Sequence, residues 1–144
     1  MAEDQGVTAD PGDIDPLAAL LDEELGASRT KTITVELRSG ARVPWTVQQV
    51  SDDVYKRLQK RCRRKLGKSK ETVWDGDLFA SLLIYHATVS PDLNDPRLLT
   101  KYGVPVAEEV VDKILLPGQK DFVGNEAMTL MGYLDELIED AKNS

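Results

Sequence analysis

Residues 32–45 read TITVELRSGARVPW, and this stretch decides the fold class. Apolar and polar residues alternate from residue 32 to residue 37, which predicts a strand with one buried face. Ser39-Gly40 predicts a turn, after which residues 41–45 can return as a second strand. Pro44 has no backbone donor, so we expect the second strand to lie at a sheet edge. Because a lone hairpin is not stable in water, helices must cover its apolar face.

Helical patterns dominate the rest of the chain. Ser51 followed by Asp52 predicts a helix start, since a capping hydroxyl and an acid in the first turn both stabilise that end. Apolar residues then recur every four residues up to Leu66, and Gly67 is typical of a helix end. Similar signals predict helices near residues 75–88, 96–102, 106–116, 119–131 and 133–141. We therefore expect an α+β, mainly α fold, in which an N-terminal β-hairpin packs on a bundle of about five helices.

The N-terminal segment differs in composition from the rest of the chain. We expect residues 1–30 to be a flexible, disordered acidic tail and residues 31–141 to be a single globular domain. Residues 1–28 contain no Lys or Arg, so the net charge of −7 originates there. The acidic residues of this segment are Glu3, Asp4, Asp10, Asp13, Asp15, Asp22, Glu23 and Glu24.

The tail also carries one short amphipathic pattern. Pro16 suits the first position of a helix, and the apolar residues that follow lie on one side of it. They are Leu17, Leu20, Leu21 and Leu25. Because a helix of ~10 residues is marginal alone in water, it needs a partner surface, either on its own domain or on another protein.

Composition sets the broad class. No apolar run approaches the ~20 residues that a membrane span requires. The N-terminus has neither a basic region nor an apolar stretch, so we expect no secretory signal. The single cysteine, Cys62, excludes an internal disulfide and a multi-cysteine metal site. We therefore expect a cytoplasmic protein with no membrane partner and no cofactor.

Two residues are candidates for catalysis, and neither has the neighbours that catalysis needs. His86 is the only histidine, and a general base requires an orienting carboxylate and a substrate pocket. Cys62 falls on an apolar stripe, and no second histidine is available to activate it. Asp75-Gly76-Asp77 resembles the start of a calcium loop but lacks the remaining ligands. We therefore expect that the protein is not an enzyme.

A basic run is the strongest anomaly in the sequence. Residues 56–70 hold nine Lys or Arg residues and no acid. The members on the expected helix 54–70 are Lys56, Arg57, Lys60, Arg61, Arg63, Arg64 and Lys65. Such a patch can contact phosphates, face solvent or bind an acidic protein segment. No aromatic residue is interleaved to stack on single-stranded bases, so we do not expect a nucleic-acid partner.

Several short motifs occur in an order that is similar to that of a known family. They are VPW at 43–45, LLIYHATV at 82–89, SPDLND at 90–95, ILLPGQ at 114–119 and LMGY at 130–133. In this order the chain resembles the XkdN-like tail assembly chaperones of long-tailed bacteriophages, over about residues 32–138. The chain departs from the family at Gln119, where an acid is usual.

The resemblance implies a non-catalytic role in the cytoplasm of a bacterial host. Such chaperones coat the aggregation-prone tape measure protein, help to recruit tail tube subunits, and are absent from the mature particle. A longer form made by frameshifting often contacts the tube protein, and the protein sequence leaves open both that form and homo-oligomerisation. Two alternatives are a small nucleic-acid-binding or regulatory protein that uses the basic helix 54–70, and a minor structural component of a tail-like particle.

A chaperone for a long helical chain needs an apolar groove that binds reversibly. Methionine suits adaptable binding surfaces, and the last part of the chain combines methionine with aromatic residues. The partner-binding candidates are Phe122, Met128, Leu130, Met131, Tyr133 and Leu137.

Overall fold

The computed structural model describes residues 15–22, 29–65, 67–68, 71–133 and 138 of the 144-residue chain. The expected hairpin is present and forms strands β1 (Thr30–Glu36) and β2 (Arg42–Gln48), which pair antiparallel. Gly40 has a φ of 95° at the turn, a conformation that glycine adopts without strain. Alternate side chains of both strands point into the core, as the sequence pattern predicts.

The position of β2 in the sheet differs from the expectation. A third strand, β5 (Thr88–Ser90), pairs with β2 on the side away from β1, so β2 is central and β1 is an edge strand. Proline is tolerated there because β5 reaches only Thr46 and Val47, leaving Pro44 beyond the end of the shared ladder. The prediction that the strand with Pro44 lies at a sheet edge was therefore wrong. The nitrogen of Pro44, which has no hydrogen to donate, nevertheless lies on a part of β2 that β5 does not pair with.

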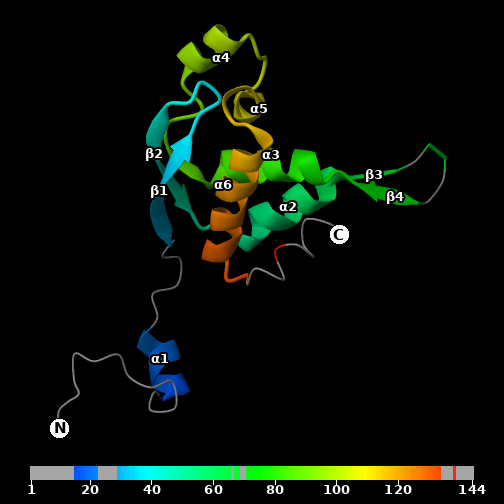
Figure 1. Cartoon of the computed structure of the whole chain (residues 1–144). Coiled ribbons are helices and arrows are strands. Elements are labelled where there is room, and N and C mark those ends of the chain that lie inside the picture. Colours follow the sequence, from blue (N-terminus) through cyan, green and yellow to red (C-terminus); the bar gives the residue numbers. More distant parts are fainter. Residues whose placement is uncertain (1–14, 23–28, 66, 69–70, 134–137, 139–144) are drawn as a thin grey trace.

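Two helices follow the hairpin. Helix α2 (Asp52–Cys62) begins as expected, because the Ser51 hydroxyl accepts a hydrogen bond from the Val54 amide. Helix α3 (Gly76–Ala87) is capped by Asp75 and lies at the centre of the molecule, buried over much of its circumference. Figure 1 shows α3 beside α2, with α6 crossing α3 on the side of the sheet.

The expected helix 54–70 is wrong beyond Cys62. The chain turns there into a second hairpin, in which β3 (Arg63–Lys65) pairs antiparallel with β4 (Thr72–Trp74). The amide of Asp75 donates to the carbonyl of Cys62, which closes the base of this hairpin. Figure 1 shows that the hairpin projects from the body of the domain.

The C-terminal half matches the predicted order of helices. Helix α4 (Pro96–Tyr102) has Asp95 as its cap and ends at Gly103, whose φ is 64°. A 3₁₀ turn, η2 (Ala107–Glu109), leads into α5 (Val110–Ile114). Helix α6 (Pro117–Leu130) begins at Pro117, which takes the first helical position and does not break the helix.

The buried side chains form two clusters. One joins the sheet to α5 and α6 around Trp45 and Ile84, and the other joins α2, α3 and α6 around Phe79 and Met128. No helix in the described part of the chain is both long and apolar enough to cross a membrane.

The two chain ends are described in part. Helix α1 (Pro16–Asp22) forms in the acidic tail, and it exposes all its residues. Residues 1–14 and 23–28 lie outside the described residues, and Leu25 is among them. Most of the expected helix 133–141 also lies outside the described residues. Ile138 is described, is helical and is buried in the second cluster.

Candidate partner-binding surface

The six candidate groove residues do not form one surface. Met128 is 1% exposed and belongs to the core, so it is a packing residue. Leu130 packs partly buried against the first cluster, and Met131 and Tyr133 pack against the second. Leu137 lies outside the described residues. Phe122 is different, because 37% of its surface is exposed on α6.

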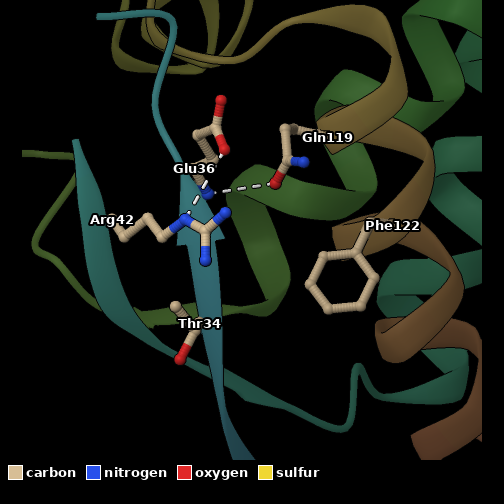
Figure 2. Close-up of a pocket in the computed structure, with 5 residues that line it drawn as sticks. All are labelled: Thr34, Glu36, Arg42, Gln119 and Phe122. Atoms are coloured by element: carbon tan, nitrogen blue, oxygen red, sulfur yellow. Dashed lines mark hydrogen bonds and ion pairs between the residues drawn. The ribbon is translucent and has the colours of Figure 1, made fainter. Parts of the chain in front are cut away.

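A hollow of roughly 320 Å³ lies where Phe122 meets the sheet. Figure 2 shows Phe122 and Gln119 of α6 on one side of it, and Thr34, Glu36 and Arg42 of the β1–β2 hairpin on the other. The aromatic ring is the large apolar element of this lining, and the other four side chains are polar. An exposed aromatic surrounded by polar groups is a common arrangement at reversible protein interfaces.

The polar side of the hollow is fixed by two contacts between its own residues. The side-chain Oε1 of Gln119 accepts a hydrogen bond of 3.0 Å from the backbone amide of Glu36. The Glu36 carboxylate lies 3.6 Å from Nε of Arg42, its neighbour across the strands. Both contacts appear as dashed lines in Figure 2. The alternation of β1 places Thr34 and Glu36 on one face, but the sequence offered no signal that Gln119 lies beside them.

The basic residues are divided between two elements. Lys56, Arg57, Lys60 and Arg61 lie on α2, whereas Arg63, Arg64 and Lys65 form β3. Several are already engaged. Arg61 binds Glu108 at 2.5 Å, Arg64 binds Asp75 at 2.6 Å, and the Arg63 guanidinium lies over the Trp74 ring. The basic residues 56–65, which the alternative of a nucleic-acid-binding protein places on one helix, therefore lie on a helix and a hairpin. Acidic neighbours neutralise part of their charge.

A second hollow, of roughly 220 Å³, lies between α2 and the end of α3. Its lining residues are Val54, Arg57, Leu58, Arg61 and His86. The pKa of His86 is lowered, first by desolvation and further by Arg57 and Arg61, while Glu108 opposes the shift. The imidazole is therefore neutral near pH 7.

Cys62 is fully buried, and this burial raises the pKa of its thiol to about 11, with Asp75 adding to the shift. Since the thiolate is the nucleophile, the buried thiol is unreactive near neutral pH. No group of three or more His, Cys, Asp or Glu side chains in the described ranges could hold a metal ion.

A buried lysine connects three helices. Lys120 of α6 is 6% exposed, and its Nζ lies 2.6 Å from Asp112 of α5 and 2.8 Å from Asp77 of α3. The Ser81 hydroxyl donates to the same Asp112 oxygen at 3.0 Å. Because the two carboxylates reach solvent while the ammonium is covered, this cluster links α3, α5 and α6 through a buried charge that is paired on both sides.

The fold is that of a small, mainly helical α+β protein. The chain belongs to the phage XkdN-like tail assembly chaperone proteins, whose family model matches residues 17–142. This family has a non-catalytic role in phage tail assembly.

The fold is similar to that of the protein YqbN, known from a crystal structure, with a TM-score of 0.50 and 18% sequence identity. The similarity covers 73% of this chain and 87% of that chain. No match was found among curated proteins.

Proposed function

We propose that this protein binds the tape measure protein in the bacterial host cytoplasm, keeps it from aggregating, and helps to recruit tail tube subunits. We further propose that it is released before the particle matures. The observation that carries the proposal is the exposed Phe122 ring beside a polar-rimmed hollow, in a member of a tail assembly chaperone family.

The physical properties of the hollow suit a partner that must later be released. A single aromatic anchor gives a modest binding energy, and the polar rim stays hydrated when the partner leaves. A helical segment with an apolar stripe can place one side chain against Phe122 and its polar flanks against Arg42 and Glu36. Weak contacts of this kind, repeated along a long partner, protect it without trapping it.

Co-expression with the tape measure protein tests this proposal. We expect Phe122→Ser to lower the soluble fraction of the tape measure protein and to weaken binding by about 2 kcal/mol, roughly 30-fold in Kd. The matched control is Val89→Ser on β5, which is 49% exposed and lies outside the hollow. If Phe122→Ser protects the tape measure protein as well as the wild type does, the hollow is not the binding site.

The remaining parts of the proposal need their own measurements. We expect the tail tube protein to be captured by the chaperone–tape measure complex, with or without a frameshifted longer form. We also expect mass spectrometry of purified mature particles to lack this chain. Its presence there in stoichiometric amount would favour a structural component instead.

A further inference from the structure

Helix α1 is an amphipathic element whose residues are all exposed. Three of its side chains are large, apolar and mostly exposed: Leu17 at 63%, Leu20 at 67% and Leu21 at 76%. Asp15 caps the helix, since its side chain accepts a hydrogen bond from the Leu17 amide at 3.1 Å. A helix of seven residues is not stable alone in water, so its leucines need an apolar surface.

The hollow between α2 and α3 has the complementary chemistry. Val54 supplies apolar surface above Leu58, which is 4% exposed at the bottom of the hollow, and the aliphatic and cationic parts of Arg57 and Arg61 form its rim. The segment that carries the leucines is acidic, with Asp15 before them and residues 22–24, Asp-Glu-Glu, after them. The apolar side of α1 thus matches the floor of the hollow, and its acidic ends match the rim.

The rim charges are not equivalent. Arg61 is already held by Glu108 at 2.5 Å, which places a carboxylate near one end of the hollow. Arg57 is exposed and makes no ion pair with any described side chain, and its Nε contacts only the backbone carbonyl of Asp53. Arg57 is therefore the cation that an incoming acidic residue can pair with.

The connection between α1 and the domain is long enough for docking within one chain. Residues 23–29 join the end of α1 to Thr30, and seven extended residues span up to ~25 Å. Thr30 lies opposite Gln48, and α2 starts four residues beyond Gln48, at Asp52. The first turn of α2, which carries Val54, is thus within reach of α1.

We propose that α1 docks in the hollow between α2 and α3 of its own chain, with Leu17, Leu20 and Leu21 on Val54 and Leu58 and its acidic residues beside Arg57. The docked state covers the leucines when no other protein is bound. The undocked state exposes both the leucines and the hollow.

Paramagnetic relaxation in the full chain tests this proposal. Ala19→Cys places a spin label on the side of α1 opposite the leucines, and the buried Cys62 stays unlabelled because its thiol is covered. We expect the label to attenuate the amide signals of Val54, Arg57, Leu58 and His86, and reduction of the label to restore them. Attenuation confined to other residues, such as those around Phe122, or no attenuation anywhere in the domain, would overturn the proposal.

Matched variants and a mixing experiment complete the test. Arg57→Glu should abolish the attenuation because it sets acid against acid, whereas Lys56→Glu, an adjacent exposed change that does not line the hollow, should retain it. Replacing Leu20 and Leu21 together by Ser should also abolish it. In a mixture of isotope-labelled wild type with unlabelled spin-labelled protein, we expect no attenuation, and attenuation there would show docking on a second copy and refute docking within one chain.

Discussion

The side chain of Gln119 accepts a hydrogen bond of 3.0 Å from the backbone amide of Glu36. This contact joins residues that are 83 positions apart and ties the first turn of α6 to the edge strand of the sheet. Glu36 cannot give this amide to β2, because donors along an antiparallel strand point alternately toward and away from the partner strand. Gln119 therefore satisfies a donor that would otherwise face an empty edge.

Replacing Gln119 by Ala should destabilise the protein by about 1 kcal/mol, because it leaves a part-buried amide without its acceptor. Gln119→Glu keeps an acceptor oxygen and places a negative charge in the first turn of α6, where the helix dipole favours it. We expect it to remain closer to the wild type, despite the nearby Glu36 carboxylate. Urea unfolding measures both, and equal losses in the two variants would contradict this role of the hydrogen bond.

Lys120→Met should lower the free energy of unfolding by about 1–3 kcal/mol, because the ammonium makes two charged hydrogen bonds under a covered surface. Asp77 and Asp112 remain hydrated after the change, being 85% and 50% exposed. The matched control is Lys113→Met on the exposed side of α5, which should change stability little. A loss at Lys113 equal to that at Lys120 would mean that the buried cluster has no special contribution.

The same cluster predicts a pH dependence. Burial alone would lower the pKa of Lys120, but hydrogen bonds to Asp112 and Asp77 outweigh it, so its pKa is raised above the ordinary 10.5. A lysine whose pKa is higher in the folded protein than in the unfolded chain stabilises the fold. This contribution is full at pH values below the pKa of the unfolded chain, and it is lost as the pH rises through the pKa of the folded protein. The stability difference between wild type and Lys120→Met should thus be constant near neutral pH and shrink above 10.5. A difference that grows in that range would be opposite to this prediction.

The Cys62 thiol should react with a disulfide reagent at pH 8 only as fast as the protein opens. It is fully buried, and its pKa of about 11 leaves little thiolate at that pH. A thiol introduced on α1 by Ala19→Cys should react at once. In urea, which unfolds the protein, Cys62 should react at the same rate as that thiol. Rapid modification of Cys62 in the native wild type would show that the site opens readily.

Deleting residues 1–28 should raise non-specific affinity for a polyanion such as heparin, roughly tenfold at low salt and hardly at all at high salt. The reason is that the acidic segment and the basic residues of α2 and β3 have opposite charge. Replacing the acidic residues of this segment by Asn and Gln should raise the affinity as the deletion does. This variant keeps the length of the segment, so it distinguishes the effect of its charge from that of its size. Unchanged affinity in fluorescence anisotropy would mean that the tail does not mask the basic surface.

Local signals in the sequence predicted much of the fold. The alternation over residues 32–37 predicted the hairpin, and Ser51 predicted the start of α2. These features are encoded within a few neighbouring residues, by side-chain period and by capping hydrogen bonds. They do not depend on which distant element packs against them.

The missed elements depend on such distant contacts. Leu66 follows Cys62 by four residues, and the basic residues between them favour a helix, so the local pattern extended α2 too far. Thr72, Val73 and Trp74 are good strand formers and were the available signal for the hairpin. β5 is three residues long and is defined only by its pairing with β2. The hollow at Phe122 likewise arises from the packing of α6 on the sheet.

The placement of Pro44 affects how readily the sheet can pair with a sheet of another copy of the protein. On the outer side of β2, beyond the end of β5, a strand of another molecule would lie beside Pro44, which has no backbone N–H to donate. On the opposite border of the sheet, one amide of β1 is already occupied by a side chain. Both borders of the sheet therefore offer an incomplete row of amides to a strand of another molecule, which makes edge-to-edge association less favourable.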